Sequence, residues 1–296
     1  MWAIGNEMET GGKADNPDLW ATIEACAAAA KKADPNHPTM TVIAEIGGKV
    51  KAINQYCPSI DIIGINSYGS MPSLSGRYKS SGGVKPYIVT EFGPAGTWES
   101  GKNAWGAVPE LTSTQKGKVY ADGYKKTVMG DPAMCLGSYA FTWGNKQEAT
   151  ATWFGMLLPD GSRLESVDTL SQLWTGKPVA RHCPRIDSLK ADSKDQVDPG
   201  TEVTVTLRGS HPDGDKCTVK WVLAREAAQY NTGGGAEKAQ ATLNEAIIKA
   251  DDAGAVVRMP ATPGGYRLFV YIYDQHGGAA TGNVVLCTKG AKTTAK

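Results

Sequence analysis

Two glutamates, each at the end of a short apolar run, are the residues whose type and position best suit catalysis. The run from Trp2 to Glu7 (WAIGNE) opens the chain, and the run from Pro86 to Gly93 (PYIVTEFG) follows the same plan. Each run is short enough for a buried strand, and a glycine ends the second. Carboxylates at the ends of parallel strands face a common site. Such a pair can supply the acid and the nucleophile that cleavage of a glycosidic bond requires.

Polar and aromatic residues near other expected strand ends are candidates for substrate contact. Asn6 could hydrogen-bond a sugar hydroxyl, and a turn-forming role is the alternative. Tyr68 could hold Glu91 through its hydroxyl, or pack as an aromatic at the rim. Trp143 could stack on a sugar ring, or belong to the core. The loop after it adds candidates for which a structural or solvated role is equally good: Asn145, Lys146, Glu148 and Trp153.

Other titratable residues suggest no second chemistry. We expect Glu9, Glu45 and Glu99, which lie near strand ends or in loops, to be solvated rather than catalytic. The four histidines lie in loop-like segments with no serine or cysteine partner, so no catalytic triad is expected.

The six cysteines form neither a CxxC motif nor a cluster with histidine, so the sequence predicts no metal site. Cys26 and Cys135 fall in apolar runs and are expected to be buried thiols. Cys183, Cys217 and Cys287 fall in or beside the second predicted domain, where one disulfide is left open.

The composition is typical of a soluble globular chain and excludes several classes of partner. Of the 296 residues, 41% are hydrophobic and 21% charged, which argues against disorder. The net charge is +1 and the basic residues are scattered, so nucleic acid is not an expected partner. No apolar stretch reaches the roughly 18 residues of a membrane span. A doubly wound parallel sheet would also place ligands at strand ends, but the sequence has no GxGxxG or GxxxxGK[ST] loop that would favour it.

Short apolar runs alternate with helical stretches through residues 1–178. This alternation is typical of parallel strands joined by helical crossovers, and polar residues just after the strands are typical of the active-site face of a (β/α)8 barrel. After the opening strand, the expected strands are 39–44, 60–66, 87–90 and 135–142. The expected helices are 17–32, 50–56, 74–80, 113–129 and 167–174.

The pattern changes at an expected linker, residues 178–184. Beyond it, apolar and polar residues alternate with a period of two in the runs 202–207, 218–223, 266–273 and 283–286. Short alternating runs separated by turns predict a β-sandwich. Residues 233–250 are expected to be a helical or mobile insertion, and the tail after Lys289 to be disordered.

These motifs resemble the catalytic domain of glycoside hydrolase family 2 and its wider clan. The run ending in Asn6 and Glu7 is similar to the fourth barrel strand of that family, and residues 88–93 are similar to the seventh. Residues 62–68 and 138–144 are similar to the sixth and eighth strands.

The resemblance covers about residues 1–176 and implies a fold class. That fold class is a partial (β/α)8 TIM barrel, strands four to eight, followed by a small all-β immunoglobulin-like sandwich. The implied domains are residues 1–178 and 184–290. The first three barrel strands have no counterpart, so the chain is expected to be a fragment, and inactivity of the isolated chain is one expected outcome.

The resemblance also implies a function, a retaining β-glycoside hydrolase that acts on an oligo- or polysaccharide without a metal or other cofactor. Glu7 would be the acid/base and Glu91 the nucleophile of a glycosyl-enzyme intermediate, with carboxyl groups ~5–5.5 Å apart. The alternatives are a transglycosylase on the same scaffold and a non-catalytic carbohydrate-binding or cell-surface protein. The family favours a periplasmic or secreted location, although no signal peptide is visible.

Overall fold

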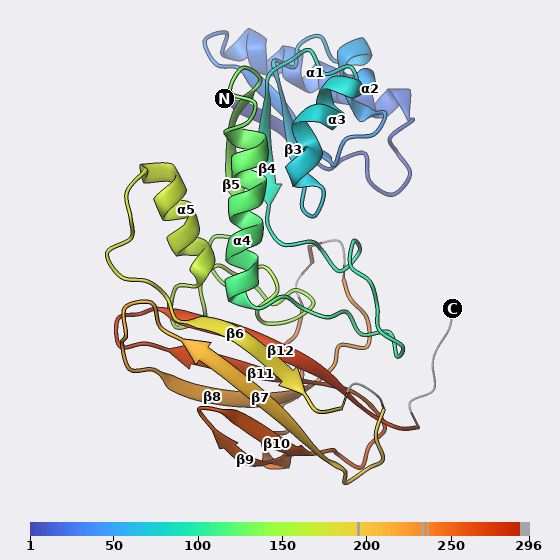
Figure 1. Ribbon diagram of the computed structural model, residues 1–296. Helices are drawn as coiled ribbons and strands as arrows, with labels where there is room; N and C mark the ends of the chain where they lie inside the picture. Colours follow the sequence, from blue (N-terminus) through green and yellow to red (C-terminus); the bar gives the residue numbers. More distant parts are fainter. Residues whose placement is uncertain (194–195, 232–233, 236, 291–296) are drawn as a thin grey trace. The chain divides into compact units, whose positions relative to one another are not determined.

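The computed structural model describes residues 1–193, 196–231, 234–235 and 237–290 of the chain (Figure 1). Backbone contacts divide the chain into two compact units. The first unit comprises residues 1–93 and 122–141, and the second comprises residues 94–121 and 142–296. The domain boundaries expected near residues 178 and 184 stay a prediction.

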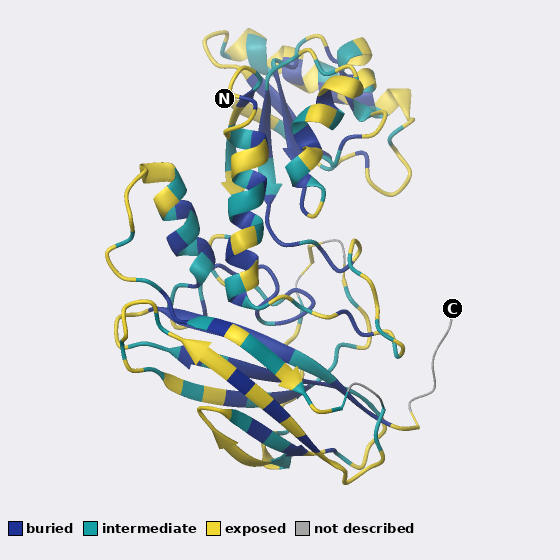
Figure 2. Cartoon of the chain, in the orientation of Figure 1, coloured by how far each residue is buried: buried dark blue, intermediate teal, exposed yellow. Residues whose placement is uncertain are grey.

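The first unit is built on a five-stranded parallel sheet whose strands pair in chain order (Figure 1). Its strands are β1 (Trp2–Asn6), β2 (Thr39–Ala44), β3 (Ile62–Asn66), β4 (Tyr87–Phe92) and β5 (Cys135–Ala140). The central strand β3 is buried along its whole length, as strands covered on both faces are (Figure 2). Because all pairings are parallel, the C-terminal ends of the strands lie along one edge of the sheet.

Helices α1 (Pro17–Ala33), α2 (Lys49–Tyr56) and α3 (Leu74–Ser80) belong to the crossovers between the first four strands. Helix α1 begins where the sequence predicts it. The Asn16 side chain accepts a hydrogen bond from the backbone N–H of Asp18 at 3.0 Å, and Pro17 occupies the first turn.

The buried face of α1 corrects one expectation about the cysteines. Trp20, Ile23 and Ala27 are buried, at the spacing of one helical face. Cys26 lies off that face and is exposed, so its predicted burial is wrong. Cys135 is buried as predicted, and all six cysteines are free thiols, so the disulfide left open by the sequence is absent.

The described residues form two further α-helices, α4 and α5. Helix α4 (Ser113–Gly123) continues into the π-helical turn η2 (Tyr124–Val128), and α5 (Glu165–Thr175) follows β5. Within the part of the chain that is described, no helix is both long and apolar enough to cross a membrane.

The expected fold class, a partial (β/α)8 barrel followed by an immunoglobulin-like sandwich, is wrong in its barrel. The parallel sheet is open, with edges at β1 and β5, and the described residues form five α-helices, too few for a (β/α)8 barrel. Both edges carry exposed aromatic side chains, among them Trp2 and Tyr139, which are 50% and 60% exposed. The strand–helix pattern is misleading because open and closed parallel sheets share it.

The second unit contains two antiparallel sheets (Figure 1). One has the order β6 (Arg185–Ala191), β7 (Glu202–Ser210), β10 (Gly254–Arg258) and β9 (Ile247–Asp251). The other has the order β12 (Ala279–Thr288), β11 (Gly264–Tyr273) and β8 (Thr218–Arg225). Alternate residues of β7 are buried, and side chains from both sheets form one hydrophobic core (Figure 2).

The insertion expected at residues 233–250 is only partly described. The 3-10 turn η3 (Asn244–Ala246) and strand β9 occupy its C-terminal part, so a helix there is wrong. The predicted disorder of the tail falls largely on residues 291–296, which lie outside the described residues.

Candidate functional site

The C-terminal ends of strands β1 to β4 bring the two candidate glutamates to one edge of the first unit's sheet. The backbone N–H of Glu7 donates to the carbonyl of Val42 at 2.9 Å, which continues the β1–β2 pairing past Asn6. On the other side, Glu91 pairs with Asn66 across β3 and β4. Both glutamates are half-buried.

Asn66, at the end of β3, links the two sides of this edge. Its Nδ2 donates to Oε1 of Glu7 at 2.8 Å and to Oδ1 of Asn6 at 3.1 Å. Its Oδ1 accepts a hydrogen bond from the hydroxyl of Thr90 at 2.6 Å, which fixes the orientation of the amide. Asn66 is 3% exposed, so these partners replace water. The candidate acid and the residue next to Glu91 are therefore held by one side chain.

Ser67 and Tyr68, the two residues after Asn66, donate hydrogen bonds to two more glutamates at strand ends. The hydroxyl of Ser67 donates to Oε2 of Glu45 at 2.7 Å, and the hydroxyl of Tyr68 donates to Oε2 of Glu91 at 2.6 Å. Residues 66–68 therefore bond three glutamates from the ends of three different strands, and we name them the clamp segment. The hydrogen bond that the sequence suggested between Tyr68 and Glu91 is present.

Two of the three clamped glutamates have an unusual backbone conformation. Glu7 and Glu45 have φ angles of 52° and 59°, in the left-handed region that glycine favours. Such residues cost about 1–3 kcal/mol each and cluster at sites where the surrounding structure needs them. The strain therefore marks this sheet edge as a functional candidate independently of the sequence motifs.

Glu45 is an ion-paired member of the site rather than a solvated glutamate. Arg77 of α3 donates to its Oε1 at 2.7 Å, and the carboxylate also accepts from Ser67 and Ser70. Partial burial opposes ionisation of Glu45, but these donors outweigh it and hold its pKa below the ordinary value. Glu45 therefore remains an anion beside the clamp segment.

The other glutamates expected to be solvated differ from one another. Glu9 is 3% exposed, so the expectation for it is wrong. Its Oε1 accepts the backbone N–H of Ala44 at 2.8 Å and pairs with Lys49 at 3.1 Å, which ties the loop after β1 to the end of β2. Glu99 is exposed, as expected.

Three predicted contact residues belong to the second unit, so their part in this site stays a prediction. Trp143 is 64% exposed and Asn145 is exposed, with its amide near the carbonyl of Ala151 at 3.4 Å. Trp153 is 3% exposed and donates its indole N–H to the carbonyl of Ala95 at 3.1 Å.

Sequence reasoning gave no role to Asn66, Ser67 or Thr90. The polar residues at the end of the apolar run of β3 could have indicated a site, because residues at the ends of parallel strands meet at one edge of the sheet. Their hydrogen-bond partners could not be predicted from the sequence, because Asn66 and Glu7 are 59 residues apart in the chain.

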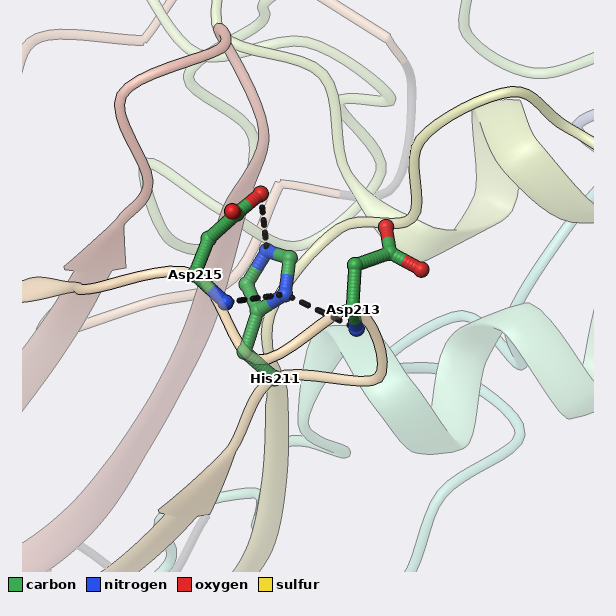
Figure 3. A group of neighbouring side chains, drawn as sticks. All are labelled: His211, Asp213 and Asp215. Atoms are coloured by element: carbon green, nitrogen blue, oxygen red, sulfur yellow. Dashed lines mark hydrogen bonds and ion pairs between the residues drawn. The ribbon is translucent and has the colours of Figure 1, made fainter.

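A second cluster of titratable groups lies in the turn between β7 and β8 of the second unit, where His211, Asp213 and Asp215 come together (Figure 3). The His211 Nδ1 atom accepts the backbone N–H groups of Asp213 and Asp215 at 3.2 and 3.4 Å (Figure 3). A nitrogen that accepts carries no proton, so in the neutral ring Nε2 carries it. That Nε2 lies 3.4 Å from Asp274. Neither ring nitrogen keeps a lone pair for a metal ion, so the cluster is a hydrogen-bonded turn.

Asp274 gives this turn a defined response to acid. Its side chain is 1% exposed, and burial opposes its ionisation, but the N–H groups of Gly278 and His276 and the ring of His211 outweigh burial and hold its pKa below the ordinary 3.8. The folded chain therefore binds this proton less readily than the unfolded chain. Ionised Asp274 stabilises the fold above that ordinary value, and the stabilisation is lost as the pH falls below it.

We therefore expect Asp274→Asn to lower the free energy of unfolding at pH 7 by about 1–3 kcal/mol, because the amide is a weaker acceptor for buried N–H groups. The difference from the wild type should shrink as the pH falls below about 4. Urea unfolding followed by tryptophan fluorescence at several pH values measures it. A difference that is constant with pH would contradict the assignment.

No family model matches the sequence, and no curated protein matches it. Among solved structures, an exo-β-agarase is similar with a TM-score of 0.41 and 18% identity, over 55% of this chain and 23% of that chain. A DUF4784 family protein from Bacteroides caccae has a TM-score of 0.21 and 16% identity, over 35% and 24% of the two chains. Wild-type OgpA from Akkermansia muciniphila has a TM-score of 0.20 and 11% identity, over 92% and 72%.

These TM-scores are too low for the likeness to define a fold or a function. The chain also spans less than a quarter of the length of the agarase that it matches.

Proposed function

We propose that the chain hydrolyses a β-glycosidic bond of an oligo- or polysaccharide, with Glu7 and Glu91 as its catalytic residues. The observation that carries the proposal is the clamp segment, because Asn66 bonds Glu7 and Tyr68 bonds Glu91 at the same sheet edge. In open α/β sheets, ligands bind beyond the carboxyl ends of the strands. Two carboxyl groups fixed at such an edge are the minimum for glycoside hydrolysis.

The partners of Glu91 suit the role of nucleophile. A nucleophilic carboxylate must be an anion, and a hydrogen bond donated to its oxygen favours the charged form. The Tyr68 hydroxyl donates such a bond to Oε2 at 2.6 Å. The resemblance of residues 88–93 to the nucleophile strand of glycoside hydrolase family 2 agrees with this role.

The partners of Glu7 suit the role of acid/base. The amide of Asn66 can only donate through Nδ2, so Oε1 of Glu7 acts as an acceptor, and the proton of the acid form belongs on Oε2. Among the described residues, Oε2 of Glu7 has no hydrogen-bond partner that would compete for that proton. Glu7 can therefore present a proton to a leaving oxygen while Asn66 holds its other oxygen.

The reaction proposed is a double displacement. The carboxylate of Glu91 attacks the anomeric carbon, and the bond to the leaving oxygen breaks as that oxygen takes the proton of Glu7. A water molecule then gives a proton to the Glu7 carboxylate and attacks the same carbon, which releases Glu91. The sugar leaves with its β configuration retained. With a sugar hydroxyl in place of water, the same steps give transglycosylation.

The role of Glu7 can be tested by the dependence of the rate on the leaving group. We expect Glu7→Gln to lower kcat/KM for aryl β-glycosides with poor leaving groups by roughly 10²–10⁴-fold, because they need a proton. A dinitrophenyl glycoside, whose leaving group departs unprotonated, should be affected far less. Initial rates over a series of phenols measure this, with Glu24→Gln as a matched control, because glutamine still accepts the Ser59 N–H there.

Two outcomes would contradict the proposal. Equal slowing of all leaving groups by Glu7→Gln would remove the acid role. Saturable binding of a saccharide by the wild type without turnover would favour the non-catalytic carbohydrate-binding protein instead.

A further inference from the structure

Glu45 follows the last residue of β2 and bonds the clamp segment, although the proposed hydrolysis gives it no step. Its backbone N–H donates to the carbonyl of Asn66 at 2.9 Å. Its Oε2 accepts the hydroxyl of Ser67 at 2.7 Å and the hydroxyl of Ser70. Glu45 therefore holds the chain on both sides of Tyr68, the residue that bonds the proposed nucleophile.

Ser67 connects Glu45 to the strand that carries Glu91. Its backbone N–H donates to the carbonyl of Glu91 at 2.9 Å, while its hydroxyl donates to Glu45. Ser67 is 1% exposed, so water cannot easily replace either partner. The carboxylate of Glu45 thus fixes the residue that lies between the partners of the proposed acid and of the proposed nucleophile.

Arg77 of α3 fixes the orientation of the Glu45 carboxylate. Its two terminal nitrogens donate to Oε1 at 2.7 Å and to Oε2 at 3.4 Å. The second of these nitrogens also donates to the carbonyl of Ser70 at 2.9 Å, and Nε donates to the hydroxyl of Ser73 at 3.0 Å. A planar guanidinium with several partners holds a carboxylate in one direction, which a lysine ammonium group does not.

Every hydrogen bond of the Glu45 carboxylate uses it as an acceptor, which suits an anion. Oε1 accepts the backbone N–H of Ile46 at 2.9 Å and the guanidinium of Arg77, and Oε2 accepts two hydroxyls. A proton on either oxygen would displace one of these donors. Glycine would relieve the left-handed φ of 59° at this position, but it would lose all of these bonds.

Among the described residues, Arg77 is the cation in the salt bridge of Glu45. Lys49 of α2 bonds the carbonyl of Ala44, the neighbour of Glu45, but its charge is paired with Glu9 at 3.1 Å. The other charged groups that contact the clamp segment are the carboxylates of Glu7 and Glu91, and like charges disfavour an anion. Loss of the Arg77 charge should therefore raise the pKa of Glu45.

We propose that Glu45 is a positioning residue, whose carboxylate, paired with Arg77, holds the clamp segment in the geometry that catalysis needs. The inference rests on the hydrolysis proposed for Glu7 and Glu91, and it adds a residue that touches neither the sugar nor the reacting atoms. Its loss should slow the chemical step and leave substrate binding nearly unchanged, because misplaced catalytic groups can cost about 10²-fold in rate.

Initial rates on an aryl β-glycoside test the proposal. We expect Glu45→Gln, which keeps the shape of the side chain, to lower kcat by roughly 10–100-fold and to change KM by at most about twofold. Asp61→Asn is the matched control and should keep the wild-type rate. The Lys31–Asp61 pair is as exposed as the Arg77–Glu45 pair, with side chains 36% exposed against 35% and 38%. Asp61 lies just before β3, at the N-terminal edge of the sheet.

The pH dependence of the rate distinguishes positioning from a loss of fold. In Arg77→Met, Glu45 should bind a proton more readily and release the clamp segment, so the acid limb of kcat/KM should move to higher pH than in the wild type. Adding Glu45→Gln to Arg77→Met removes the group that titrates, so the shift should disappear while the rate stays low. Arg77→Lys restores a cation and should move the acid limb back towards its wild-type position.

A spectroscopic measurement separates failure of this inference from failure of the catalytic proposal. In Glu45→Gln, the backbone amide resonances of Ser67 and Tyr68 in a ¹H–¹⁵N spectrum should shift, and in Asp61→Asn they should stay in place. If they shift but the wild type hydrolyses no aryl glycoside, the catalytic proposal alone fails. If they do not shift, if the effect of Glu45→Gln falls on KM instead of kcat, or if Arg77→Met leaves the acid limb in place, the positioning role is overturned.

Discussion

Glu91→Gln should lower kcat for aryl β-glycosides by roughly 10⁴-fold or more, because it removes the proposed nucleophile and not merely a binding contact. Glutamine has nearly the same shape and keeps an oxygen that can accept the Tyr68 hydroxyl, which lies 2.6 Å from Glu91. The clamp segment should therefore stay in place and saccharide affinity should be retained. Initial rates and calorimetric binding on the same preparation measure the two quantities separately.

Chemical rescue distinguishes the nucleophile from the acid/base. With Glu91→Ala, azide should enter the vacated space and give a glycosyl azide of inverted configuration in a single displacement. With Glu7→Ala, azide should attack the glycosyl-enzyme and give the retained azide. If the Glu91 variants keep more than about a tenth of the wild-type rate, or if the two azide products are exchanged, the proposed roles are wrong.

Arg267→Met should destabilise the second unit strongly, because it removes the cation from a buried ion pair. Arg267 of β11 is 2% exposed and binds Glu226 through two nitrogens, at 2.7 and 2.8 Å. It also donates to Asn283 at 2.8 Å and to the carbonyl of Val108 at 2.9 Å. Removing one member of a buried ion pair leaves an uncompensated charge, so the free energy of unfolding should fall by about 3–5 kcal/mol.

Loss of the Arg267 charge should affect two buried glutamates. Burial disfavours the anion of Glu110, but the charges of Lys116 and Arg267 hold its pKa below the ordinary value, so Arg267→Met removes support from Glu110 as well as from Glu226. Adding Glu226→Gln to Arg267→Met should recover part of the lost stability, because it removes the unpaired charge.

A surface ion pair provides the matched control for Arg267. Arg258 and Glu202 lie 3.0 Å apart with side chains 59% and 52% exposed. Arg258→Met should cost at most about 1 kcal/mol. Urea unfolding of both variants compares the two pairs directly, and equal effects would contradict the importance of burial.

The secondary structure of the first unit was largely predictable because its signals are local. The Asn16 cap, the proline after it and the apolar spacing define α1 within one turn, and the apolar run 60–66 contains β3. The fold class was not predictable from the same pattern. A parallel sheet closes into a barrel only if its first and last strands pair with each other. An alternation of strands and helices along the sequence does not reveal whether they do.

Part of the candidate site could likewise be predicted from local sequence patterns, and part could not. The positions of Glu7 and Glu91 at strand ends follow from the sequence, because an apolar run that stops at a carboxylate is a local pattern. The roles of Asn66 and Tyr68 depend on strands brought together by folding. In the second unit, the burial of Glu110 and Arg267 contradicts the usual exposure of charged residues, and only their spatial partners explain it.

The clamp segment also couples the two proposed catalytic groups to each other. Asn66 bonds Glu7 and Tyr68 bonds Glu91, while Ser67 between them bonds Glu45. Two residues of chain span at most about 7 Å, so one short peptide carries the groups that hold all three carboxylates. A change in the backbone of residues 66–68 would therefore displace the proposed acid and the proposed nucleophile together, without altering either glutamate.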